Sequence, residues 1–351
     1  MQNEFLALLK KINSVQDVAA MWQSGRKTIN ITGLMGPVKT GFLCALKEII
    51  ELPGPLVFLV PKRDDVRAYL RELNYFYPEL PMRELYPAGL VTANVDAKNQ
   101  ELLAERIGAL ELMRTGENSI VFVTAEAFVQ KLPTPDSIFK DNMVLLVGKE
   151  IEQEEILTAL VNMGYERTDQ VETLGQFSLR GDILDIFPIN TQEPLRVEWF
   201  DNTINAMRSF DQGTQRSLET LEKTEIVPIA WKSVEGNADL FQYVQEHSFV
   251  VLDEPSQFFQ EVKNTYSANK EHEDKLFTPE QVITCCNRHK LLVPSVLPHP
   301  YFPKAMQVTV PVRTMAPYNR NTDLLIKDMS GWLAEGLVPL IMMSTPEKRQ
   351  D

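Results

Sequence analysis

Residues 33–40, Gly-Leu-Met-Gly-Pro-Val-Lys-Thr, could form a loop that binds phosphate. They lie between a predicted strand and a predicted helix, where backbone N–H groups and a helix N-terminus can receive an anion. The pattern G-x-x-x-x-G-K-[ST] is matched at its first glycine, its lysine and its threonine, while Val38 replaces its second glycine. The candidate phosphate-loop residues are Gly33, Gly36, Lys39 and Thr40.

Two residues of this loop oppose phosphate binding. The loop directs successive N–H groups inward, often at positive φ, and the β-branched side chain of Val38 resists that conformation. Pro37 has no N–H group to donate. We therefore expect a degenerate loop without ATP hydrolysis, in which Lys39 is a lysine at a helix start, exposed to solvent.

An acidic pair follows a second apolar strand. The segment Phe249–Leu252 ends in Asp253 and Glu254, the arrangement with which ATPases hold magnesium and orient water. Pro255 follows at once, so the other interpretation is a plain strand end, with Asp253 available as the N-cap of a helix. Weak nucleotide binding stays open.

Other residues that carry chemistry are scattered. The four histidines have no cysteine or carboxylate at metal-ligand spacing, and there is no Gly-x-Ser-x-Gly motif. The three cysteines do not form a disulfide framework, which favours a reduced compartment. No apolar stretch approaches the ~18 residues of a membrane span. We expect a cytoplasmic protein with no metal site and no membrane contact.

The net charge of the 351-residue chain is −13, which opposes the neutralisation of phosphates that duplex DNA binding needs. Residues 151–250 alone supply −11 of it. Within 151–200 the only basic residues are Arg167, Arg180 and Arg196. Arginine beside aromatic residues is typical of protein interfaces. Internal ion pairing, for example of Arg196 with Asp185 on a neighbouring strand, is an equally good interpretation.

Short apolar runs alternate with amphipathic stretches in the first 124 residues, which predicts a parallel α/β sheet preceded by a helical hairpin. Residues 125–212 are expected to form an inserted α+β domain, and residues 213–351 to return to α/β, on a chain truncated at its C-terminus. The predicted strands are Thr28–Thr32, Pro55–Val60, Ser119–Thr124, Met143–Val147, Glu225–Pro228, Phe249–Leu252, Gln307–Val312 and Val338–Met343. The predicted helices are Thr40–Glu51, Asp64–Phe76, Asp96–Arg114, Glu152–Met163, Ala238–Glu246, Pro255–Tyr266 and Thr322–Ala334.

A β-hairpin is predicted in the α+β segment. Its arms are Leu195–Phe200 and Thr203–Met207, joined by Asp201 and Asn202, which tolerate the left-handed backbone of a two-residue turn. The alternation along the first arm places Trp199 inward. By contrast, Val293–Pro303 is rich in proline and is expected to be a linker.

The sequence resembles the UvrB-like module shared by the excision-repair protein UvrB and the bacterial transcription-repair coupling factors. The resemblance covers essentially the whole chain and is carried by Gly164–Arg167, Gly175–Pro188, Arg196–Phe200, Asn205–Asp211 and Thr214–Ser217. It implies a degenerate helicase-like parallel-sheet domain, of the P-loop NTPase or RecA type, interrupted by an inserted α+β domain that binds UvrA. The UvrA-binding residues implied are Arg167, Phe177, Arg180, Phe187, Arg196 and Glu198.

Two features favour the N-terminal module of a coupling factor over UvrB itself: Val38 in the loop, and residues 88–95, which are too short for the Tyr-rich hairpin of UvrB. The resemblance then implies a non-catalytic module that recruits UvrA to stalled RNA polymerase. The motor and C-terminal domains of a longer protein would be further partners. ATP, magnesium, RNA polymerase and DNA would be bound only by those other domains. The alternative is an ATP-dependent DNA-damage-processing enzyme of UvrB type.

Overall fold

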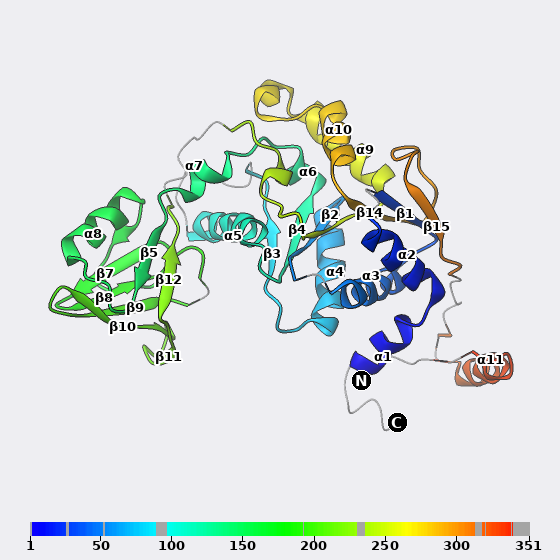
Figure 1. Ribbon diagram of the computed structural model, residues 1–351, viewed down its shortest axis with the longest axis horizontal. Coiled ribbons are helices and arrows are strands. Elements are labelled where there is room, and N and C mark those ends of the chain that lie inside the picture. Colours follow the sequence, from blue (N-terminus) through cyan, green and yellow to red (C-terminus); the bar gives the residue numbers. More distant parts are fainter. Residues whose placement is uncertain are drawn as a thin grey trace. The chain divides into compact units, whose positions relative to one another are not determined.

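The computed structural model of the chain describes residues 2–25, 28–51, 53–88, 97–191, 193–229, 236–312, 318–319, 321–337 and 339. The chain divides into two compact units, Met1–Val310 and Pro311–Asp351. The second unit contains one described helix, α11 (Thr322–Ala334). All the sheets of the described residues lie in the first unit (Figure 1).

Seven of the described strands, all parallel, form the larger sheet in the order β15-β1-β14-β13-β2-β4-β3. Strands β1, β2, β4, β13 and β14 are almost wholly buried, which explains their continuous apolar runs, since a parallel sheet is covered on both faces. The strands are β1 (Thr28–Thr32), β2 (Leu56–Val60), β3 (Met82–Leu85), β4 (Ile120–Thr124), β13 (Phe249–Leu252), β14 (Leu291–Ser295) and β15 (Met306–Thr309).

Helices cover the two faces of this sheet, and side chains alternate between them. Phe58 and Phe122 stack near Tyr69 of α4 on one face, while Val57 and Val121 join the core formed with α5, α9 and α10 on the other. The helices of this part are α1 (Gln2–Leu9), α2 (Asn13–Gln23), α3 (Pro37–Ile50), α4 (Arg63–Phe76), α5 (Ala97–Thr115), α6 (Ala125–Phe128), α7 (Pro135–Phe139), α9 (Pro255–Ala268), α10 (Pro279–Arg288) and the 3-10 helices η2 (Leu240–Gln242) and η3 (Lys270–Lys275).

Residues 143–229 build a separate α+β part around a six-stranded sheet in the order β11-β10-β9-β8-β7-β6, drawn in green in Figure 1. One face of that sheet packs on α8 (Gln153–Asn162) and on a two-stranded sheet, β12-β5. The strands are β5 (Met143–Leu146), β6 (Glu166–Arg167), β7 (Gln176–Arg180), β8 (Ile183–Ile186), β9 (Leu195–Phe200), β10 (Thr203–Phe210), β11 (Ser217–Thr220) and β12 (Lys223–Ile226). The predicted fold class, a parallel α/β sheet with an α+β insertion, is confirmed.

The predicted hairpin is also confirmed. β9 and β10 pair in antiparallel fashion, Asp201 has φ 57°, and Trp199 is buried with its indole N–H donating to the Ile151 carbonyl at 3.1 Å. None of the described helices is both long enough and apolar enough to span a membrane.

Three predictions about individual elements are wrong. The strand expected at Glu225–Pro228 does not return to the parallel sheet, because β12 pairs with β5 inside the α+β part. The expected linker begins inside β14, a central strand whose Pro294 carbonyl accepts the Glu254 N–H at 3.1 Å. The helix expected at Ala238–Glu246 is only the short η2, because the backbone of Ala238 is paired with Leu132 in a β-bridge. The expected strand Val338–Met343 and most of residues 88–95 lie outside the described residues.

Repulsion between Glu111 on α5 and Glu225 on β12 predicts a pH dependence of stability. Burial, and then repulsion from Glu225 on β12, raise the pKa of Glu111 to about 7. This pKa lies above the value in an unfolded chain, so the stabilisation is complete below about pH 4.5 and is lost as the pH rises through 7. Glu111→Gln removes this titration. The stability of the variant relative to the unchanged chain should therefore increase with pH, and the difference in free energy of unfolding should be about 2–3 kcal/mol more in favour of the variant at pH 8 than at pH 4.5.

Urea unfolding of both proteins at several pH values measures this difference. The matched control is Glu79→Gln, which removes an exposed carboxylate from the turn after α4, away from Glu111. An identical pH profile for the Glu111→Gln variant and the unchanged chain would contradict the assignment of the titration to Glu111.

Candidate partner-binding site

The face of the six-stranded sheet that points away from α8 carries a row of polar side chains. Strand alternation puts Phe177, Leu184, Val197 and Met207 into the core on α8, so their neighbours along each strand point the other way. We call this surface the polar face. It comprises Ser178 and Arg180 on β7, Ile183 and Asp185 on β8, Arg196, Glu198 and Phe200 on β9, and Arg208 on β10.

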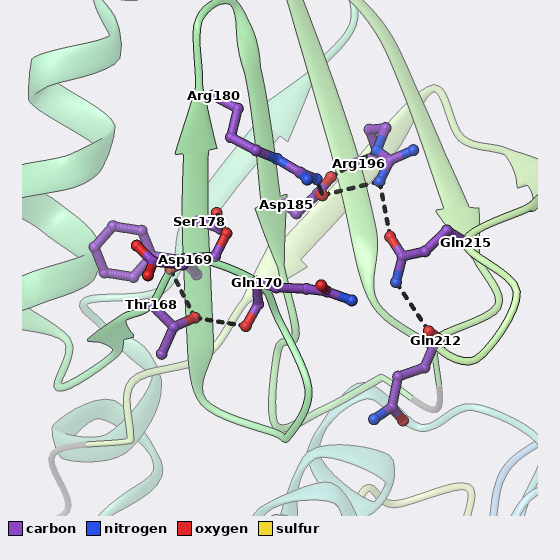
Figure 2. A network of polar contacts seen from close by, with 10 residues as sticks. Thr168, Asp169, Gln170, Ser178, Arg180, Asp185, Arg196, Gln212 and Gln215 are labelled. Carbon is purple, nitrogen blue, oxygen red and sulfur yellow. Dashed lines mark hydrogen bonds and ion pairs between the residues drawn. The ribbon is translucent and has the colours of Figure 1, made fainter.

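Asp185 is the centre of the polar face. Its carboxylate is only 2% exposed and is bound by two arginines from the strands on either side (Figure 2). Arg196 donates to both carboxylate oxygens, from Nε at 2.7 Å and from Nη2 at 2.9 Å, and Arg180 donates from Nη2 at 2.6 Å. The predicted pairing of Arg196 with Asp185 is confirmed. A carboxylate shared by two guanidinium groups fixes the orientation of both.

Arg196 is held on all sides. Its guanidinium lies over the ring of Phe210 at 4.6 Å, and its Nη2 also donates to Gln215 Oε1 at 3.2 Å. The hydrogen bonds to Asp185 raise the pKa of Arg196, and they outweigh the opposing effect of burial. Arg196 is therefore a structural member of the polar face. Neither Phe210 nor Gln215 was predicted to contact Arg196. Gln215 lies in a tight turn and has a positive φ.

Arg180 differs from Arg196 because its side chain is 54% exposed while one end of its guanidinium is bound to Asp185. Among the described residues, Asp185 is its only hydrogen-bonding partner. Glu198 is partly exposed and pairs with Arg208 on β10. An exposed arginine whose orientation is already fixed can bind a partner's carboxylate or carbonyl with little loss of side-chain entropy.

The structure does not bring the other predicted binding residues to this face. Phe177 is fully buried and Phe187 is 8% exposed, so their rings offer little surface to a partner, and the binding role that the resemblance implies for them stays a prediction. Arg167 is exposed on the edge strand β6, in register with Phe177, and so projects on the side opposite Arg180. Of the predicted binding residues, Arg180 and, in part, Glu198 are accessible on the polar face.

The backbone conformation of the loop before α3 explains its two glycines. A Cβ atom at Gly33 would lie 2.3 Å from the Val310 carbonyl oxygen, and φ there is 91°. Gly36 has φ 55° and precedes Pro37, the first residue of α3. Both glycines are thus required by the backbone path alone.

Lys39 is not a solvent-exposed lysine, contrary to the simpler prediction. Its ammonium is 2.6 Å from Asp253 Oδ1 and 2.7 Å from Glu254 Oε1, and its side chain is only 8% exposed. Burial lowers the pKa of Lys39, but attraction by the two carboxylates and their hydrogen bonds outweigh this, so the pKa lies above its ordinary value. We call Lys39, Asp253 and Glu254 the charge triad.

The charge triad lies where a phosphate loop and an acidic strand end would hold a magnesium–nucleotide complex. Thr40, the residue that would contact the metal ion, is fully buried and donates its hydroxyl hydrogen to Glu72 on α4. Glu254 also accepts the N–H of Val296 at 3.1 Å. Each side chain retained from the motif is therefore already engaged inside the protein. No cluster of three or more metal-ligating side chains occurs in the described part of the chain.

Comparison with known proteins assigns a family to the part that carries the polar face. Residues 143–230 match the model of the UvrB interaction domain, a range that ends just after β12. This part of the chain is similar to a UvrB interaction domain. The polar face and its arginines lie within that domain, whereas the charge triad does not.

Longer matches extend beyond the UvrB interaction domain. The transcription-repair-coupling factor of Bacillus subtilis is 30% identical over 63% of this chain, that of Staphylococcus aureus strain MRSA252 is 38% identical over 62%, and that of Escherichia coli K12 is 26% identical over 69%. The matches cover only 18–21% of the length of these relatives. The predicted resemblance to the N-terminal UvrB-like module of a coupling factor is confirmed.

Proposed function

We propose that this chain is a non-catalytic module that recruits the excision-repair protein UvrA in transcription-repair coupling. The observation that carries the proposal is Arg180, an exposed arginine whose orientation is fixed by a buried carboxylate within the UvrB interaction domain. Arginine is enriched in interface hot spots, and an arginine that is already oriented loses little entropy when it binds.

The acidity of the chain fits a role that depends on protein contacts. The net charge of −13 opposes contact with nucleic-acid phosphates. In a coupling factor, we propose, RNA polymerase, DNA, ATP and magnesium are bound by parts of the longer protein outside this module. Those parts would also compete with UvrA for the polar face until RNA polymerase is engaged.

The test is a titration of UvrA with the unchanged chain and with Arg180→Ala. We expect the variant to bind about 30-fold more weakly, which corresponds to about 2 kcal/mol, since a partly exposed arginine stands at the lower end of hot-spot values. Arg71→Ala on α4 removes the same charge from the parallel-sheet part and serves as the matched control. Equal affinity of the Arg180→Ala variant and the unchanged chain would contradict the role of Arg180.

The rival function, an ATP-dependent DNA-processing enzyme of UvrB type, is favoured by the retained Lys39, Asp253 and Glu254. Against it, Lys39 is bound to both carboxylates inside the protein, and Val38 and Pro37 occupy the loop. We expect micromolar ATP with magnesium to leave the thermal unfolding of the chain unchanged. Stabilisation under these conditions would support the rival instead.

A further inference from the structure

Phe200 is the most exposed large apolar side chain among the described residues, at 78%. It ends β9 directly before the turn at Asp201 and Asn202. Strand alternation puts it on the polar face, two residues beyond Glu198. An exposed aromatic ring at a defined position is typical of a contact residue, because burial of the ring by a partner is favourable.

A shallow pocket of about 440 Å³ lies beside this ring. It is lined by Val147 and Gly148 on one side and by the hairpin residues Phe200, Asp201 and 203–205 on the other. Backbone hydrogen bonds hold the two sides together, from Gly148 N to Ile204 O at 2.8 Å and from Ile151 N to Asn202 O at 2.8 Å. The pocket is therefore preformed, which lowers the entropic cost of filling it.

The surroundings of the pocket are acidic. Segments 147–153 and 199–205 contain Glu150, Glu152 and Asp201 but only one basic residue, Lys149. Asp182 adds a further carboxylate, since its side chain accepts a hydrogen bond from Gln153 at 3.2 Å. A partner segment that carries basic side chains complements these charges.

We propose that Phe200 and this pocket form a second docking point, which receives an apolar side chain from a basic segment of the protein that binds Arg180. The inference rests on the proposed function, so the partner used to test it is UvrA. Arg180 is in register with Ile183, and Ile183 with Glu198. Phe200 is thus two strands and two residues away from Arg180, or roughly 12 Å, and one partner surface can contact both.

UvrA binding by the unchanged chain, Phe200→Ala and Phe200→Leu tests the apolar contact. We expect Phe200→Ala to weaken binding about 10–30-fold and Phe200→Leu to weaken it less than about 3-fold, because leucine keeps a large apolar side chain beside the pocket. The fold of each variant is checked by circular dichroism and by tryptophan emission. Leu218→Ala on β11 is the matched control, because it truncates another exposed apolar side chain of the same sheet.

The charge of the partner is tested with the double variant Glu150→Gln, Asp201→Asn; asparagine tolerates the positive φ at position 201. We expect it to bind UvrA about 3–10-fold more weakly and with a smaller dependence on salt. Unchanged binding of this variant would overturn the proposal that the partner segment is basic. If the unchanged chain binds UvrA and Phe200→Ala binds it equally well, the docking point alone is overturned. If the unchanged chain does not bind UvrA, the proposed function is overturned together with the docking point.

Discussion

Replacing Lys39 by methionine should lower the free energy of unfolding by about 3–5 kcal/mol, in the absence of any nucleotide. Methionine has a similar length but no charge, so Asp253, which is 5% exposed, and Glu254 would face each other without a cation. The variant loses contacts that join α3 to the end of β13. Lys39 and Asp253 are 214 residues apart in the sequence. Urea unfolding followed by circular dichroism measures the change.

The triple variant Lys39→Met, Asp253→Asn, Glu254→Gln is the matched control. It removes all the charges of the charge triad, so no buried carboxylate is left unpaired, and we expect it to recover most of the lost stability. The pH provides a second check. Because the pKa of Lys39 is raised by folding, its contribution is complete below about pH 10.5 and is lost only as the pH rises through the folded value.

A nucleotide-binding lysine would behave differently. In that case Lys39→Met would leave the stability of the nucleotide-free chain nearly unchanged and would abolish stabilisation by ATP. That result would contradict the structural role of the charge triad and would favour the ATP-dependent alternative.

The fold was largely predictable where burial alone decides the structure. Strands such as Leu56–Val60 and Ile120–Thr124 are continuous apolar runs because helices cover both faces of the sheet. The turn at Asp201 and the pairing of Arg196 with Asp185 were also predictable, because both depend on neighbouring strands and on local backbone preference.

Tertiary pairing decided the elements that sequence patterns did not predict correctly. β12 looks like the first strand of a returning α/β segment, but its partner, β5, precedes it by about 80 residues. The proline at position 294 suggested a linker, yet β14 occupies the middle of the sheet. Such pairings are non-local, so propensity and periodicity in a short window carry no information about them.

The candidate site was predictable in residue type but not in orientation. Phe177 and Arg180 lie three residues apart on one strand, and the alternation of β7 sends the first into the core and the second to the surface. The signal for this difference was present in the period of two along the strand. The contacts of Lys39 were harder to predict, because its partners Asp253 and Glu254 follow the inserted domain in the sequence.

Replacing Asp185 by alanine should affect both stability and partner binding. Arg196, whose side chain is 18% exposed, would lose its bidentate partner while remaining stacked on Phe210, and we expect the free energy of unfolding to fall by about 3 kcal/mol. Arg180 would keep its charge but lose the contact that orients it. UvrA binding should therefore weaken nearly as much as in the Arg180→Ala variant, although Asp185 itself is buried.

A double-mutant cycle separates this orienting effect from general damage. If Asp185 acts through Arg180, the variant Arg180→Ala, Asp185→Ala should bind UvrA about as well as either single variant, because the two changes remove the same contact. Glu198→Gln, which disturbs only the partly exposed pair with Arg208, should cost less than about 1 kcal/mol of stability. Additive losses of affinity in the cycle would show that Asp185 supports the sheet without orienting Arg180, and the polar face would then be a structural network beside an independent arginine.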